Sequence, residues 1–128
     1  MIKKLLTIAA SLFAITAFAG EYPDISVAEL KKAIADKKAV VIDVNGASSY
    51  KAGHIPSAID FTTAKADLAK ALPADKEALV VAYCGGPACN AYSAAADAAK
   101  KLGYKNVKHL SAGISGWKSA GEKTEAAK

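Results

Sequence analysis

The stretch from residue 79 to residue 103 constrains this chain most, because it predicts a strand, a tight loop and a helix in direct succession. The apolar run at residues 79–83 has the composition of a buried strand, and it ends on Cys84. A Gly-Gly-Pro sequence breaks this run, and an alanine-rich helix is expected from about residue 90 to residue 102. This order places a thiol at the carboxyl end of a strand, with the N-terminus of a helix directed back at it.

The loop after this strand is suited to hold an anion. It runs from Cys84 to Asn90 and is built of small residues, so that successive backbone N–H groups can point at one spot. The residues between its ends are Gly85, Gly86, Pro87, Ala88 and Cys89. The proline donates no N–H but stiffens the loop. Because a helix N-terminus adds partial positive charge and unpaired N–H groups, we expect the Cys84 thiol to have a lowered pKa and to be nucleophilic.

The first 19 residues have the three regions of a secretory signal peptide. Lys3 and Lys4 form the basic start, residues 5–18 are uncharged and largely apolar, and Ala-Phe-Ala at residues 17–19 is a cleavage motif. The apolar run is too short for a membrane-spanning helix. We therefore expect export, removal of residues 1–19 and a periplasmic location, with no membrane attachment after cleavage.

Residues 20–128 are predicted to form a single domain, with its core in about residues 26–121. A chain of this length can bury one hydrophobic core. The formal net charge is +5 for the whole chain. Its lysines are scattered among acidic residues, which is typical of a solvated surface and excludes an obvious nucleic-acid site. The chain contains no arginine, so no guanidinium is present to bind an anion through two parallel hydrogen bonds.

Expected strands and helices alternate along the chain. Strands are expected at residues 22–25, 39–44, 58–61, 79–83 and 107–110. Helices are expected from the capping box at residues 26–29 to about residue 38, and at residues 48–52, 65–72, 90–102 and 113–121, followed by a frayed polar tail at 122–128. The almost unbroken apolar run at 39–44 indicates a strand buried on both faces, as in a parallel sheet. The pattern predicts a three-layer α/β fold that binds ligands beyond the carboxyl ends of its strands.

Three segments resemble the signatures of one family. Residues 40–44 (Val-Val-Ile-Asp-Val) and residues 50–58 (Tyr-Lys-Ala-Gly-His-Ile-Pro-Ser-Ala) resemble the first signature of single-domain rhodaneses. Residues 103–117, which begin with Gly-Tyr-Lys-Asn-Val and end with Gly-Trp, resemble the C-terminal signature. Between them, Cys84 falls on the position of the family's persulfide-forming cysteine. The resemblance covers about residues 26–121.

The resemblance implies a five-stranded parallel sheet flanked by helices, and a sulfurtransferase that needs no cofactor. Sulfane sulfur would pass from a small donor to a persulfide on Cys84, and from there to a thiol or another nucleophilic acceptor. A periplasmic protein is one acceptor of this kind. Because some rhodanese-like domains only carry sulfur or bind partners, a non-catalytic carrier or binding module is the alternative interpretation.

The chain departs from the family pattern in two ways that bear on the mechanism, and the first is its lack of arginine. Many family members carry arginine at the positions of Asn45, Gly85 and Cys89. Thiosulfate is a dianion, and the missing guanidiniums should weaken its binding. A polysulfide or a protein persulfide is therefore the preferred donor over thiosulfate.

Cys89, the second cysteine of the chain, is the second departure, and it has two interpretations. Export would place both cysteines where a Cys84–Cys89 disulfide can form, and a bond across so short a loop adds little entropic stability. As a resolving thiol, Cys89 would attack a persulfide on Cys84, release sulfide and leave that disulfide. This would make the chain a redox-active thiol protein. Alternatively, Cys89 is a small apolar side chain that fills the first turn of the helix.

Asp43 and His54 are predicted to support the site without touching the reacting atoms. Asp43 ends a buried strand and is expected to hold the neighbouring loop by hydrogen bonds. The resemblance implies a structural role for His54 in a turn. No metal site is expected, because the two cysteines and two histidines have poor ligand spacing. Phosphatase chemistry is disfavoured because the position for a phosphate-binding arginine holds Asn90, and the cysteine spacing does not match a thioredoxin.

Overall fold

The computed structural model describes residues 22–126. The signal peptide predicted at residues 1–19 lies outside the described residues. Export and cleavage therefore stay predictions.

A parallel sheet forms the middle of the molecule. Its strands are β1 (Ala39–Asp43), β2 (Ile59–Asp60), β3 (Leu79–Tyr83) and β4 (Asn106–His109). They lie in the order β2-β1-β3-β4, and each neighbouring pair is parallel. In the central pair, Asp43 lies opposite Tyr83, so both strands end at the same edge.

The expected fifth strand is reduced to a single bridge. Asp24 pairs with His109 beside β4, where the Ile25 N–H donates to the His109 carbonyl at 3.0 Å and the His109 N–H donates to Pro23 at 2.9 Å. The segment cannot extend further, because Pro23 has no N–H to donate and Ser26 already caps the next helix. The expectation of a fifth, short strand at residues 22–25 was wrong in this detail, while the parallel α/β fold is confirmed.

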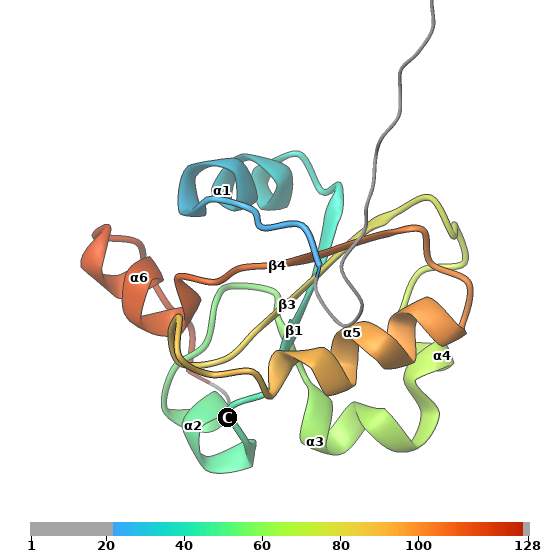
Figure 1. Cartoon of the computed structure of the whole chain (residues 1–128). Coiled ribbons are helices and arrows are strands. Elements are labelled where there is room, and N and C mark those ends of the chain that lie inside the picture. The colour runs from blue at the N-terminus through green and yellow to red at the C-terminus, as the bar shows by residue number, and fades with distance from the viewer. Residues whose placement is uncertain (1–21, 127–128) are drawn as a thin grey trace, which may run out of the picture.

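Helices cover both faces of the sheet (Figure 1). The helices are α1 (Val27–Ala35), α2 (Ala47–Ala52), α3 (Phe61–Ala64), α4 (Leu68–Ala71), α5 (Tyr92–Lys101) and α6 (Gly113–Ser119), with a 3₁₀ turn, η1 (Lys65–Asp67). Helices α1 and α6 lie on one face, and α3, α4 and α5 lie on the other. The capping box predicted for α1 is confirmed, because the Ser26 and Glu29 side chains each bond the other's backbone N–H.

Two apolar clusters hold the three layers together. On the side of α1 and α6, Val41, Val81 and Tyr83 pack with Leu30 and Trp117. On the opposite side, the cluster contains Ile42, Val80, Ala82, Leu68, Ala95, Ala96 and Ala99. Side chains of one strand point alternately to the two sides, so a strand buried on both faces must be apolar throughout. This explains the apolar run of β1, which is interrupted only at Asp43, and the apolar run of β3.

The helices differ from their expected bounds near the middle of the chain. The helix expected at residues 65–72 begins four residues earlier, at Phe61, and is interrupted by the turn η1. Its start is set by Asp60, whose carboxylate accepts hydrogen bonds from the Thr62 N–H at 3.0 Å and the Thr63 hydroxyl at 3.1 Å. Asp60 was assigned to the strand alone, and its capping role was missed.

The tail after α6 is held to the body, which corrects the expectation of fraying through residue 125. Glu125 and His54 exchange two backbone hydrogen bonds of 2.8 Å, as in an antiparallel bridge. The indole N–H of Trp117 donates to the Lys123 carbonyl at 2.7 Å. These bonds satisfy buried polar groups of the body and thereby order the tail.

Candidate active site

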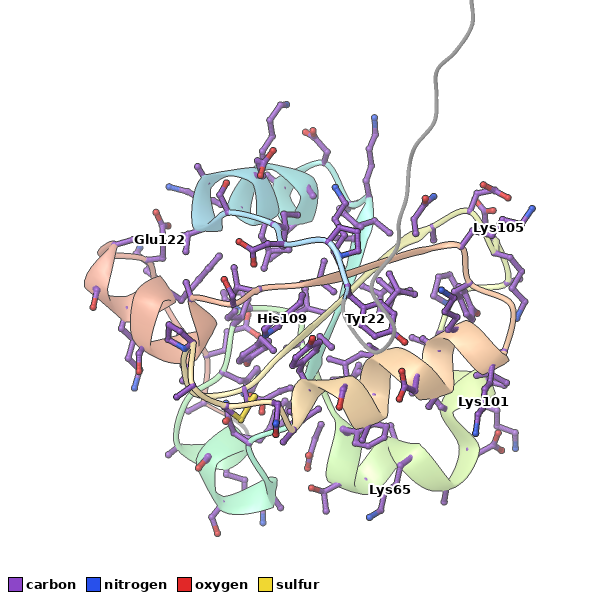
Figure 2. All side chains as sticks on the ribbon, viewed as in Figure 1. Tyr22, Lys65, Lys101, Lys105, His109 and Glu122 are labelled. Carbon is purple, nitrogen blue, oxygen red and sulfur yellow. A yellow bond between two sulfur atoms is a disulfide. The ribbon has the colours of Figure 1, made fainter. Side chains whose placement is uncertain are left out.

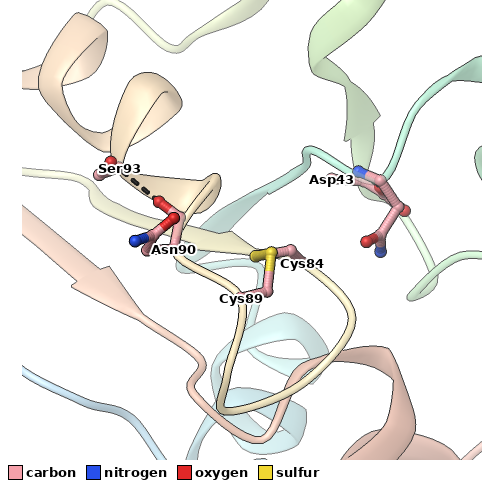
Figure 3. The surroundings of a disulfide bond; sticks show 6 residues. Asp43, Cys84, Cys89, Asn90 and Ser93 are labelled. Carbon is pink, nitrogen blue, oxygen red and sulfur yellow. Dashed lines mark hydrogen bonds between the residues drawn. A yellow bond between two sulfur atoms is a disulfide. The ribbon is translucent and has the colours of Figure 1, made fainter.

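Cys84 lies directly after β3, at the carboxyl edge of the sheet, and only 1% of it is exposed. It is joined by a disulfide to Cys89, with 6.2 Å between their Cα atoms (Figure 3). Helix α5 begins at Tyr92, two residues later than expected from the sequence. Asn90 is in the turn before it, where its carbonyl accepts a 2.9 Å bond from the Ser93 hydroxyl. The strand, loop and helix therefore follow each other as predicted.

The loop is curled by a short internal hydrogen bond. The Cys89 N–H donates to the Gly86 carbonyl at 3.1 Å, which turns the chain back so that Cys89 faces Cys84. Pro87 and Ala88 lie at the exposed tip of this turn. Within residues 22–126, no acceptor is found for the backbone N–H groups of Gly85, Gly86, Ala88 and Asn90. These donors are available to an anion in the loop.

Helix α6 fixes the other side of the loop. The N–H groups of Ile114 and Ser115 donate to the carbonyls of Cys84 and Gly85, each at 3.0 Å. Gly113 has a φ of +65°, and a Cβ built on it would lie 2.5–2.6 Å from backbone atoms of Gly85 and Gly86. Only glycine allows this close approach. Gly113 falls in the C-terminal signature but was not predicted to be part of the site.

Asp43 lies in a buried hydrogen-bond network at the end of β1. Its carboxylate accepts a 2.5 Å bond from the Tyr83 hydroxyl and a 2.7 Å bond from the Asn45 N–H. The Tyr83 hydroxyl in turn accepts a 3.1 Å bond from the Ile55 N–H. Burial raises the pKa of the Asp43 carboxyl, and the bonds from Tyr83 and Asn45 partly offset this rise. The network ties β1 and β3 to the loop that contains His54, and Tyr83 was missed as its central member.

His54 is buried and does not contact the cysteines. Its ring stacks on Tyr50 with 3.7 Å between centroids, and its Nδ1 lies 2.7 Å from the Tyr50 carbonyl oxygen. Its Nε2 is 3.7 Å from a Glu125 carboxylate oxygen. All of these contacts are with Tyr50 of α2 or Glu125 of the tail. His54 is therefore not placed to exchange a proton with Cys84.

Asn45, which follows β1, lies beside the cysteine loop. A Cβ built on Gly85 would lie 3.8 Å from the Asn45 side-chain oxygen. Asn45 and Gly85, two of the three positions at which the family pattern often has arginine, are therefore neighbours in space, and neither carries a charge here. An anion placed here would meet backbone N–H groups and one amide but no guanidinium.

The other histidine, His109, packs beside the start of α5. Its ring stacks on Tyr92 with 3.4 Å between centroids. Burial lowers the pKa of His109, and its Nε2 is enclosed without a hydrogen-bond partner. A neutral imidazole is therefore expected there.

Lys65, Lys101 and Lys105 project from the periphery and form no basic patch with one another (Figure 2). A cavity of about 760 Å³ opens at the amino ends of β1 and β3, away from Cys84, and contains neither cysteine nor histidine. Among residues 22–126, no three His, Cys, Asp or Glu side chains are grouped to hold a metal ion. In the same part of the chain, helices long and apolar enough to cross a membrane are absent.

The family is decided by a match that covers most of the described chain. The model of the rhodanese-like domain matches residues 26–120. The chain belongs to the rhodanese-like domain family. Its fold is therefore the rhodanese α/β fold, and Cys84 lies after the central strand of a rhodanese-like sheet.

Solved structures of similar fold include members with sulfurtransferase names. The BH2092 protein of Bacillus halodurans is 32% identical, with a TM-score of 0.66 over 82% of this chain and 77% of that one. The human single-domain sulfurtransferase TSTD1 is 23% identical, with a TM-score of 0.60 over 76% of this chain and 96% of that one. At that identity the second likeness shows the fold alone.

A curated relative has a different kind of name. The HTH-type transcriptional regulator Rv0324 of Mycobacterium tuberculosis is 36% identical over 95 residues. The match covers 73% of this rhodanese-like chain and 41% of the regulator. The chain thus spans about two fifths of that relative's length.

Proposed function

We propose that this rhodanese-like chain is a sulfurtransferase that carries sulfane sulfur as a persulfide on Cys84. The observation that carries the proposal is the place of Cys84 after β3, at the floor of a loop whose unpaired N–H groups can stabilise an anion. Membership in the rhodanese-like domain family supports the same chemistry.

The reaction starts from the reduced form of the loop. The Cys84 thiolate attacks a sulfane sulfur of the donor, the S–S bond of the donor breaks, and the remainder of the donor leaves as an anion. Cys84 then carries a persulfide, Cys–S–S⁻, stabilised by the N–H groups of the loop. An acceptor thiolate attacks the outer sulfur, and Cys84 leaves as a thiolate, which closes the cycle.

The intact mass of the reduced chain after treatment with polysulfide tests this proposal. We expect the Cys89→Ser variant to gain one sulfur, and Cys84→Ser to gain none. Addition of a thiol acceptor should remove the sulfur, and repeated cycles would identify an enzyme. A chain that loads once but does not turn over with small donors would instead be the carrier module. Sulfur found on the Cys84→Ser variant would contradict the assignment of Cys84.

The identity of the donor gives a second prediction. We propose a polysulfide or persulfide donor, because Asn45 and Gly85 leave the loop without a guanidinium. An Asn45→Arg substitution should raise kcat/KM for thiosulfate about 10-fold, since one charge-assisted, two-pronged contact contributes about 1.4 kcal/mol or more. Steady-state assays with thiosulfate and with polysulfide measure the effect.

Asn45→Lys is the matched control, because it adds the same charge without the fork of the guanidinium. A smaller gain is expected from it. Equal gains would mean that charge alone limits thiosulfate use, and no gain from either variant would refute a role for position 45 in donor choice.

Export to the periplasm and a periplasmic protein acceptor belong to the same proposal. The predicted signal peptide supports export. A disulfide in the loop also suits an oxidising compartment.

A further inference from the structure

We propose that the chain reduces its own persulfide: Cys89 expels sulfide from Cys84, and an external dithiol then restores the loop by attacking Cys89. This inference rests on the proposed persulfide chemistry and extends it to a second activity, the release of sulfide at the expense of a dithiol.

The first argument is proximity. Cys84 and Cys89 are bonded to each other, with their Cα atoms 6.2 Å apart. The Gly86–Cys89 turn produces this arrangement within the loop, while Cys84 is fixed to α6 through its own carbonyl. The Cys89 sulfur therefore reaches the Cys84 sulfur without any movement of strand or helix, as an intramolecular attack requires.

The second argument is the electron balance. In the persulfide Cys84–S–S⁻, the Cys89 thiolate attacks the Cys84 sulfur, and the bond to the outer sulfur breaks. The outer sulfur takes the electron pair, picks up a proton and leaves as HS⁻. The sulfane sulfur is reduced by two electrons, and the two cysteine thiols are oxidised to the disulfide. The product is the bond that the structure contains.

The third argument is the unequal exposure of the two sulfur-bearing residues. Cys84 is 1% exposed, whereas Cys89 is only partly buried and follows the exposed residues Pro87 and Ala88. In the disulfide form, an external thiol therefore reaches Cys89 more readily than Cys84. Attack on Cys89 releases Cys84 as the thiolate, next to the free N–H groups of the loop, and a stabilised leaving thiolate departs faster.

These steps define the partner by its chemistry. After the first attack, the partner is bound to Cys89 as a mixed disulfide. A second thiol of the same partner displaces Cys89 and forms the partner's own disulfide, so a dithiol completes the cycle. The net reaction converts a polysulfide of n sulfurs and a dithiol into a polysulfide of n−1 sulfurs, hydrogen sulfide and a cyclic disulfide.

A single-turnover experiment tests the release step. The reduced chain is mixed with one equivalent of tetrasulfide without oxygen, and sulfide and intact mass are followed together. We expect the wild type to release about one equivalent of sulfide and lose two hydrogens as the disulfide forms. The Cys89→Ser variant should keep the added sulfur and release at least 10-fold less sulfide, with the Cys84→Ser variant as the background for donor decomposition.

The outcomes separate the two proposals. A wild type that keeps its persulfide as the Cys89→Ser variant does, or a Cys89→Ser variant that releases sulfide equally fast, overturns the reductive step and leaves the sulfurtransferase proposal standing. If neither the wild type nor Cys89→Ser takes up or processes sulfur beyond the Cys84→Ser background, the sulfurtransferase proposal itself fails.

The recycling step has its own readout. The disulfide form is treated with the monothiol glutathione, free thiols are alkylated, and peptides are mapped by mass spectrometry. Glutathione should be found on Cys89 and the alkyl group on Cys84. Glutathione on Cys84 would refute the assigned direction of attack. Dithiothreitol should then support repeated sulfide release from tetrasulfide by the wild type, in excess of the Cys84→Ser background.

Discussion

A Tyr83→Phe substitution is expected to lower the free energy of unfolding by about 3 kcal/mol at pH 7. The Tyr83 hydroxyl is the only described donor to one carboxylate oxygen of Asp43 and accepts the bond from the Ile55 N–H. Phenylalanine keeps the packing but leaves one oxygen of the buried Asp43 carboxylate and the buried Ile55 N–H without a partner, while the other oxygen keeps its bond from Asn45. Unpaired groups of this kind cost about 1–3 kcal/mol each, and more when they are charged. Chemical denaturation measures the loss.

Tyr104→Phe is the matched control. Tyr104 is also buried, and its hydroxyl donates to a single backbone carbonyl, that of Pro73. Its removal breaks one neutral hydrogen bond, so we expect a loss of about 1 kcal/mol. An equal loss from both variants would show that the Tyr83 hydroxyl does not stabilise the Asp43 charge.

The cost of Tyr83→Phe should also depend on pH. Burial raises the pKa of Asp43 above its usual value near 3.9, so the folded state holds the proton more firmly than the unfolded state does. The free energy of unfolding therefore falls as the pH rises from the unfolded-state pKa of Asp43 to its folded-state pKa. The Tyr83 bond favours the charged carboxylate and limits this fall. Its removal raises the pKa of Asp43 further, so the variant should lose more stability at pH 7 than at pH 4. A cost that does not change with pH would contradict this coupling.

Local signals were enough to predict the part of the site that is continuous in sequence. The apolar run before Cys84 and the glycines after it set the strand and the loop, and these depend on neighbouring residues alone. The parallel sheet followed from the apolar run of β1, which is interrupted only at Asp43. Gly103, with a φ of +101°, also follows α5 where a helix end was expected.

Contacts between distant residues could not be predicted in this way. The bridge between His54 and Glu125 joins positions with no common pattern, and it orders a tail that looks merely polar in sequence. Asp60 ends a strand and caps a helix at once, and only its hydrogen bonds to Thr62 and Thr63 reveal the second role. In the sequence, Tyr83 is one more apolar strand residue, and only its contact with Asp43 shows its polar role. Periodicity identifies which residues are buried, but it does not identify their polar partners.

The contact between α6 and the cysteine loop leads to a prediction of similar size. A Gly113→Ala substitution should destabilise the fold by about 2–5 kcal/mol, from two separate causes. At a φ of +65°, any residue with a Cβ costs about 1–2 kcal/mol. The new methyl group would also overlap the backbone of Gly85 and Gly86, and overpacking costs about 1–3 kcal/mol. Thermal or chemical denaturation measures the total.

Gly121→Ala separates the two causes. Gly121 has a φ of +83°, and a Cβ built on it meets no atom within 4 Å, so this variant carries the conformational cost without the overlap. The difference between the variants therefore measures how tightly α6 presses on the loop. If Gly113→Ala is no worse than Gly121→Ala, the loop can move away from α6 at no cost. If it is worse, the overlap should also shift the carbonyls of Cys84 and Gly85 away from Ile114 and Ser115. The rate at which polysulfide loads Cys84 should then fall in Gly113→Ala and not in Gly121→Ala, because only the first substitution disturbs the loop that holds the sulfur.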